Sequence, residues 1–108
     1  MGVKFDNCDM CGMRMDHNSR EIKFTSCNLA GADMSGTLLR SAVFQDCNLS
    51  GSNMSGANLR NAKFINSNTS SINLTAANIA YTNGLTDINI DQWYQQTLAT
   101  ITTDDKDE

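Results

Sequence analysis

The chain has 108 residues, a formal net charge of −4 and no proline. This length predicts one domain, and a chain with a slight excess of acids is not expected to bind nucleic acid directly. No apolar run reaches membrane-spanning length, and the charged residues between Val3 and Met15 exclude a secretory signal there, so we expect a soluble cytoplasmic protein.

A five-residue period organises residues 1–84. A large apolar side chain occupies every fifth position, with the exception of one threonine; the series is Phe24, Leu29, Met34, Leu39, Phe44, Leu49, Met54, Leu59, Phe64, Thr69, Leu74, Ile79. Small or apolar residues stand two positions before each member of this series. Neither an α-helix nor a flat strand keeps a five-residue series on one side, so the period predicts a solenoid in which both sets point inward.

A second period of twenty residues predicts how the solenoid closes. Phe24, Phe44 and Phe64 are twenty residues apart, which corresponds to four units of five and therefore to four sides per coil. The opening segment 4–15 aligns with 23–34 at an offset of nineteen, so we place a one-residue deletion between Asp16 and Glu21. Because proline is absent, the corners are expected to turn on Gly, Asn, Asp and Ser.

The repeated units resemble the pentapeptide-repeat family, whose units read approximately A-(D/N)-L-x-x. Segments 32–36, 47–51 and 57–61 match this pattern closely, and the resemblance covers about residues 3–84. It implies an all-β solenoid, a right-handed quadrilateral β-helix of about four coils. Thr69 and Gly84 replace the large inward residue, which predicts that the coil loosens toward its C-terminal end, and Met13 is large where a small residue is usual.

After Gly84 the pattern becomes that of an amphipathic helix, within segment 85–103. Its apolar stripe consists of Ile90, Trp93, Tyr94, Thr97, Leu98 and Ile101. Asn89 or Asp91 is expected to cap the start of this helix. The favoured interpretation is that the helix covers the open end of the last coil. The alternative is a homodimer contact formed by Trp93, Tyr94, Leu98 and Ile101. Residues 104–108 are expected to form an acidic, disordered tail.

Cys8 and Cys11 form a C-x-x-C motif with His17 and Cys27 nearby, which is one signal of a zinc site. The five-residue phase places Cys8 inward and Cys11 outward, so buried structural thiols are favoured, and neither a metal nor another cofactor is expected. His17 is the only histidine. No nucleophile pairs with it in a recognisable arrangement, so no catalytic residue is predicted and an enzyme is not expected.

The outward positions predict two kinds of surface. Basic residues recur at the coil spacing and form one basic corner between the fourth and first sides: Lys4, Arg20, Lys23, Arg40, Arg60 and Lys63. The other sides carry acids and ladders of asparagine, and the candidate partner-binding residues there are Asp9, Asn28, Asp33, Asp46, Asn48 and Asn53. Asparagine is also well tolerated beside a corner, so these ladders have a purely structural interpretation as well.

The family resemblance also implies a role. Several pentapeptide-repeat proteins are similar in width and charge to a DNA duplex and occupy the DNA-binding surface of topoisomerases, and phage-encoded inhibitors of restriction and CRISPR systems use the same kind of mimicry. The resemblance therefore implies a non-enzymatic DNA-mimic inhibitor. Charge limits this hypothesis, because the last five residues hold four of the twelve acids and one of the eight bases. Residues 1–103 thus carry seven bases against eight acids.

The size of the rod distinguishes between targets. Four coils at about 4.8 Å each span about 19 Å, which equals about six base pairs at about 3.4 Å each. A CRISPR interference complex or a restriction enzyme therefore fits better than a topoisomerase, unless two copies join through the C-terminal helix. The competing hypothesis is a protein-interaction scaffold that uses the basic corner or a patch around Trp93 without DNA mimicry.

Overall fold

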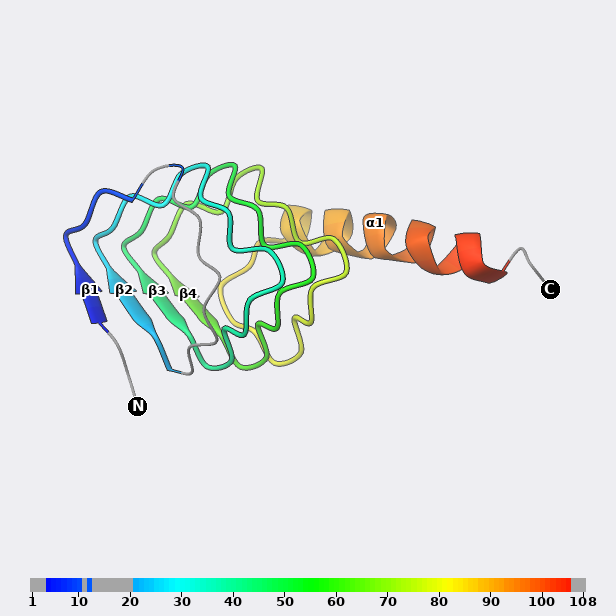
Figure 1. Ribbon diagram of the computed structural model, residues 1–108, viewed down its shortest axis with the longest axis horizontal. Helices are drawn as coiled ribbons and strands as arrows, with labels where there is room; N and C mark the ends of the chain where they lie inside the picture. The colour runs from blue at the N-terminus through cyan, green and yellow to red at the C-terminus, as the bar shows by residue number, and fades with distance from the viewer. Residues whose placement is uncertain (1–3, 11, 13–20, 106–108) are drawn as a thin grey trace.

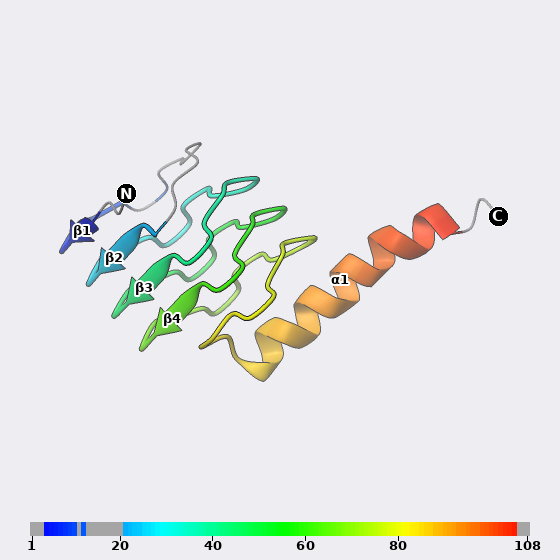
Figure 2. The ribbon, with the colours of Figure 1, turned by 90° about the horizontal axis from the view of Figure 1, so that it is seen from below.

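The computed structural model describes residues 4–10, 12 and 21–105, with side chains up to Leu98. Four short strands form one parallel sheet in the order β1-β2-β3-β4: β1 (Lys4–Asp6), β2 (Lys23–Thr25), β3 (Val43–Gln45) and β4 (Lys63–Ile65). Figure 1 shows the strands side by side, with the chain winding round between one strand and the next. Figure 2 shows the same coils stacked one after another, in a direction oblique to the long axis of the molecule.

Three further ladders of parallel backbone bridges accompany this sheet. The second side carries Asp9, Asn28, Asn48 and Asn68; the third carries Asp33, Asn53 and Asn73; the fourth carries Leu38, Asn58 and Asn78. Together with the strands of the first side, they give four walls per coil. The predicted quadrilateral β-helix with a C-terminal helix is therefore confirmed.

The register of the first side follows the aromatic residues. Phe5 pairs with Phe24, Phe24 with Phe44, and Phe44 with Phe64. Their rings stack with centroid separations of 5.1, 5.2 and 5.0 Å. The predicted phenylalanine ladder is confirmed, as is the nineteen-residue offset between the first two rungs. The position of the deletion itself, between Asp16 and Glu21, falls on residues outside the described ranges.

The axis of the solenoid is filled by the two inward series. Most of the large inward side chains between Phe24 and Leu74 are fully buried, and the small series packs between them. Burying one large apolar side chain contributes about 1.5–3 kcal/mol, so this thin column supplies most of the stability of the coil.

The corners are left-handed turns that recur every fifth residue. From Glu21 to Tyr81 each corner residue, two positions after the large inward one, has a positive φ between 54° and 69°. Gly, Asn, Asp and Ser occupy most of these positions, as predicted, because they adopt this region at the lowest energy. The exceptions are Glu21, Ala76 and Tyr81, whose side chains oppose this conformation.

Helix α1 (Asp87–Asp105) follows the last coil directly. Thr86 is its N-cap: Thr86 Oγ1 accepts a hydrogen bond of 3.1 Å from the Asn89 N–H, and Asn89 Oδ1 accepts one of 3.0 Å from the Thr86 N–H. The prediction of Asn89 or Asp91 as the cap was wrong, because the chain is already helical from Asp87. The helix also extends through Asp104 and Asp105, two residues into the segment predicted to be a disordered tail.

The helix runs away from the fourth coil along the long axis of the molecule (Figure 1). The whole chain measures 49 × 26 × 24 Å along its principal axes. Neither α1 nor any other described segment forms a helix that is long and apolar enough to cross a membrane.

Candidate partner-binding surfaces

Polar contacts attach the first turns of α1 to the fourth coil. Asn89 is only 3% exposed, and its Nδ2 donates to the carbonyl of Thr69 at 2.9 Å. Thr69 Oγ1 in turn donates to Asn89 Oδ1 at 2.7 Å. One turn farther on, Trp93 is half-buried and its Nε1 donates to the carbonyl of Ala77 at 2.8 Å. The predicted loosening at Thr69 is therefore wrong, since this residue is the point at which the helix is anchored.

A third turn of the helix also touches the solenoid. The Ala76 N–H donates to Thr97 Oγ1 at 3.0 Å, and Thr75 Oγ1 lies 2.8 Å from Gln96 Oε1. Asn89, Trp93 and Thr97 are spaced four residues apart, so they form the face of α1 that meets the last coil.

The apolar stripe predicted from the sequence is therefore divided between two faces. Trp93 and Thr97 face the solenoid, whereas Ile90, Tyr94 and Leu98 are 38%, 52% and 37% exposed. The side chain of Ile101 lies outside the described part of the chain. The helix thus meets the last coil through part of the stripe, and Ile90, Tyr94 and Leu98 form a partly exposed apolar strip, which we call the outer strip.

The asparagine ladders on the outer walls have a structural task. In each unit the side-chain Oδ1 accepts a hydrogen bond from the backbone N–H two residues later, for example Asn28 from Ala30 at 3.2 Å and Asn53 from Ser55 at 3.0 Å. Asp33 makes the same bond to Ser35 at 3.1 Å. This bond satisfies a donor that the turn leaves unpaired. The carbonyl oxygens of these side chains are thus held in fixed positions along the rod.

The six predicted partner-binding residues lie in three places. Asp9, Asn28 and Asn48 share the ladder of the second side. Asp33 and Asn53 share the ladder of the third side. Asp46 is a corner residue between the first and second sides, and its Oδ1 accepts a bond of 3.2 Å from Asn66 Nδ2 one coil above. The structure therefore groups Asp46 with Asp9 and separates both from Asp33.

Acidic and basic residues are segregated across the first side. Asp6 and Asp9 lie in the first coil, on either side of the corner between the first and second sides, and Asp46 lies at the same corner in the third coil. We call these three residues the acidic corner. Five bases lie at the other edge, around the corner between the fourth and first sides: Lys4, Lys23, Arg40, Arg60 and Lys63. Arg20, the sixth predicted member of this basic corner, falls outside the described residues.

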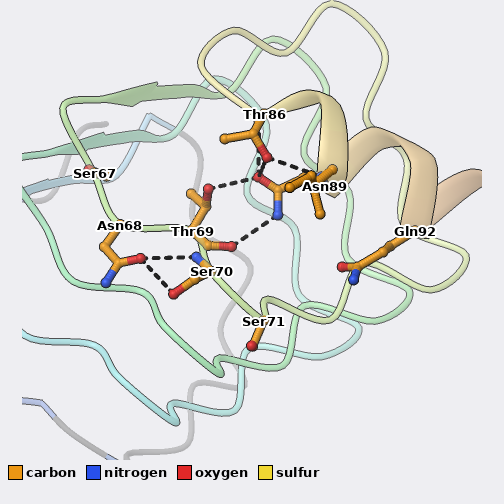
Figure 3. Close-up of a pocket in the computed structure, with 9 residues that line it drawn as sticks. Ser67, Asn68, Thr69, Ser70, Ser71, Thr86, Asn89 and Gln92 are labelled. Atoms are coloured by element: carbon orange, nitrogen blue, oxygen red, sulfur yellow. Dashed lines mark hydrogen bonds between the residues drawn. The ribbon is translucent and has the colours of Figure 1, made fainter.

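A pocket of about 480 Å³ lies beside the helix (Figure 3). It is lined by residues 67–71 of the fourth coil and by Thr86, Ile88, Asn89 and Gln92 from the start of α1. The repeat pattern does not predict this pocket, because it lies outside the solenoid and not along its filled axis. None of its lining side chains is titratable, so it holds no acid–base group for catalysis.

The thiols form a column beside the aromatic ladder. Cys27 Sγ donates to the carbonyl of Phe5 at 3.2 Å, and Cys47 Sγ donates to the carbonyl of Phe24 at 3.3 Å. Ser67 Oγ continues the column with a bond of 2.9 Å to Phe44. Burial raises the pKa of Cys47 above its ordinary value. Cys47 is therefore a neutral donor for the carbonyl of Phe24.

The zinc interpretation depends on residues beyond the described ranges. Cys11 and His17 both fall there. Among the residues that the structure describes, no three His, Cys, Asp or Glu side chains come together in a way that could hold a metal ion.

A four-walled rod with a filled axis and regularly spaced outer side chains is the architecture of a solenoid protein. The model of the pentapeptide repeat region matches residues 1–74 and 20–91 of the chain. The protein therefore belongs to the pentapeptide-repeat family.

Two solved structures illustrate the similarity. One is a trypsin-treated variant of QnrB1, a plasmid-mediated fluoroquinolone resistance protein, with 14% identity and a TM-score of 0.38 over 71% of this chain and 62% of that one. The other is the pentapeptide repeat protein Rfr23 from the cyanobacterium Cyanothece 51142, with 18% identity and a TM-score of 0.27 over 74% of this chain and 82% of that one. The chain thus spans less than two thirds of QnrB1. No curated protein matches the chain.

Sequence reasoning missed the roles of two residues. The first is Asn89, read as a cap and found buried against Thr69. The second is Tyr81, which occupies a left-handed corner with its ring beside Arg60. A signal for each existed, since Asn89 lies twenty residues after Thr69, and Tyr81 twenty after Asn61.

Proposed function

We propose that this protein is a non-catalytic decoy that occupies the DNA-binding surface of a nucleic-acid-processing complex. The acidic corner carries this proposal. It presents Asp6, Asp9 and Asp46 on a frame whose backbone is bonded from coil to coil. Clefts that bind DNA attract negative charge held at fixed spacing, and a rigid frame loses little conformational entropy on binding.

The dimensions of the rod favour a small target. Its four coils correspond to about six base pairs of duplex, at about 3.4 Å each. We therefore favour a phage-type inhibitor of host defence, directed at a CRISPR interference complex or a restriction enzyme, over a topoisomerase-binding protein. Such an inhibitor acts in the cytoplasm of the host cell. A homodimer through the outer strip of α1 would lengthen the decoy.

The test is competition for DNA. The purified protein is titrated into DNA-binding assays of a CRISPR interference complex, a restriction enzyme and DNA gyrase, at several salt concentrations. A decoy raises the apparent Kd for DNA in at least one assay, and its inhibition weakens steeply as salt rises.

Two variants locate the surface. The double change Asp9→Asn and Asp46→Asn removes two charges from the acidic corner, while asparagine already occupies both columns in neighbouring coils at Asn28 and Asn66. Asp33→Asn is the control, because it removes one charge from another side and keeps the acceptor for the Ser35 N–H. The decoy is contradicted if the double variant inhibits as well as the wild type.

The alternative function is a protein-interaction scaffold without DNA mimicry. Trp93 does not favour it, because the indole nitrogen already donates to the carbonyl of Ala77 in the same chain. The basic corner favours this alternative, since its described bases are exposed, with the exception of the half-buried Lys23. A partner that binds the wild type equally at low and high salt, and that DNA does not displace, would support the scaffold.

A further inference from the structure

We propose that the basic corner, together with Tyr81, is a binding surface for single-stranded nucleic acid. This surface lies on the opposite edge of the first side from the acidic corner. It does not depend on the decoy function, because each surface can be removed while the other is retained.

The bases of this corner stand one above another. Lys4 is the register partner of Lys23 across β1 and β2, and Lys63 lies two coils above Lys23 in the same column. Arg40 and Arg60 lie one coil apart at the adjoining corner, where their carbonyls accept bonds from the corner residues of the coils below. Val43 separates Lys23 from Lys63 in the lysine column, and Arg40 supplies the base of that coil, so positive charge recurs along this edge at the rung spacing of about 4.8 Å.

This arrangement does not stabilise the fold. Like charges placed directly opposite each other on neighbouring strands are destabilising, and Lys4 and Lys23 are such a pair. Lys4, Arg40, Arg60 and Lys63 are exposed, and Glu21 lies at the same corner. The described part of the row therefore carries an excess of positive charge that an anionic partner would neutralise.

Tyr81 adds a flat aromatic surface at the end of the row. The three corners below it in the column are Glu21, Ser41 and Asn61. Tyr81 has a φ of 61° and is 70% exposed, so a bulky ring is held in a strained backbone conformation without being buried. The Arg60 guanidinium carbon lies 4.8 Å from the ring centroid.

Cations that follow one line beside an aromatic ring match single-stranded nucleic acid. The backbone of a single strand supplies successive phosphates to the bases, and an unpaired nucleobase stacks on an aromatic ring or on a guanidinium plane. An acidic protein surface would neutralise the charges equally well, but it has no need of the exposed ring. A duplex keeps its bases stacked inside and offers none to Tyr81.

The experiment uses fluorescence anisotropy to measure the binding of a labelled oligothymidylate at several salt concentrations. Its length of about twelve nucleotides lies within the range that one small single-strand-binding domain covers. Wild-type protein is expected to bind the single strand more tightly than a duplex of equal length. If three phosphates are neutralised by Arg40, Arg60 and Lys63, changing all three to Gln lowers the slope of log K against log salt by about 2.

Tyr81→Asn separates stacking from charge. Asn61 holds the equivalent corner one coil below, so this variant should fold at least as stably as the wild type. We expect it to lose about fivefold or more in affinity for the single strand, with an unchanged salt slope. Lys106→Gln is the control, because it removes a positive charge far along the chain from this corner, and it should bind like the wild type.

Three results would overturn the proposal. The first is the absence of binding at low salt. The second is unchanged binding by the triple variant with normal circular dichroism. The third is displacement of the oligonucleotide by polyglutamate as readily as by unlabelled single strand, which would assign the corner to an acidic protein. In all three cases the assays of the acidic corner still decide the decoy function separately.

Discussion

The amide of Asn89 and the hydroxyl and carbonyl of Thr69 satisfy one another across the boundary between the helix and the last coil. Both residues are 3% exposed. Asn89 Oδ1 also accepts bonds from the backbone N–H and the hydroxyl of Thr86, so one side chain completes both the N-terminal cap and the docking contact. Thr69, which interrupts the series of large inward residues, is therefore the hydrogen-bond partner of Asn89 in α1.

Asn89→Ala tests this double role. It leaves the Thr69 hydroxyl and carbonyl buried without their partner and also breaks the capping box, so we expect the free energy of unfolding to fall by about 2–4 kcal/mol. Thr86→Ala is the matched control, because it removes the N-cap alone and should cost about 1 kcal/mol. Urea denaturation measures both. Equal losses would show that the contact with Thr69 contributes nothing.

Gly84 is expected to be far less replaceable than the corner glycines. A Cβ at Gly84 would lie 1.8 Å from the carbonyl oxygen of Phe64, and its φ is 94°. Gly51, with a φ of 67°, has no atom within 4 Å of an added Cβ. Gly51→Ala should therefore cost about 1–2 kcal/mol through its conformation alone. Gly84→Ala should cost more and detach the helix, visible as a loss of helical circular dichroism. A similar loss for both variants would contradict this assignment.

Two buried hydroxyls should respond in opposite directions to removal. Ser52 Oγ is buried without a hydrogen-bond partner, whereas Thr37 Oγ1 donates to the carbonyl of Met34 at 2.6 Å. Alanine already occupies each column, at Ala32 and at Ala57. We expect Ser52→Ala to raise the stability by about 1 kcal/mol and Thr37→Ala to lower it by about 1 kcal/mol or more. Thermal unfolding compares them, and destabilisation by Ser52→Ala would reveal a bond that Ser52 makes in solution.

The phenylalanine ladder could be predicted because the solenoid repeats the same chemistry at a fixed separation. Any residue twenty positions from Phe44 must lie directly above or below it, so sequence spacing translates into position without knowledge of other contacts. The positions of the corner residues could be predicted for the same reason. The role of Tyr81 could not be predicted in this way. The period specifies a left-handed backbone at this position, but it does not explain why a strained aromatic residue occupies it.

The orientation of α1 could not be predicted from its own residues. The apolar stripe alone predicts that its largest side chains face the coil. Instead, the bond between Asn89 and Thr69 fixes the rotation of the helix, and Trp93 follows on the same face four residues later. Successive residues are about 100° apart around a helix, so Ile90 and Tyr94, each one residue later, turn outward. A single buried polar pair outweighed the apolar pattern.

The thiol column predicts a small effect of substitution and a distinct effect of pH. Cys47→Ser should be tolerated, with a loss of about 1 kcal/mol or less, because Ser67 makes the equivalent bond one coil above. In the folded state, burial raises the pKa of Cys47 above its ordinary value of 9.0. Its contribution is therefore complete below that value and is lost as the pH rises above it. Between pH 8 and pH 10 the wild type should lose more stability than Cys47→Ser, as measured by urea denaturation; parallel losses would contradict the assignment.

The outer strip predicts self-association. Ile90, Tyr94 and Leu98 are spaced four residues apart on one face of α1, and each is partly exposed to solvent. If two copies pair this strip about a twofold axis, the same residues meet in both chains and leave the water together. The double change Tyr94→Ser and Leu98→Ser should then abolish a concentration-dependent dimer in sedimentation velocity.

Asp91→Ser with Gln95→Ser is the matched control for this prediction. These residues are also exposed and four apart, but they lie on another face of the helix, so the dimer should persist. Ser has a lower helix propensity than Leu98 in one pair and than Gln95 in the other, and helical circular dichroism therefore has to be equal in the two double variants before their masses are compared. A wild type that sediments as a monomer at all concentrations, or a control that dissociates like the Tyr94 and Leu98 variant, would show that the outer strip does not join two copies.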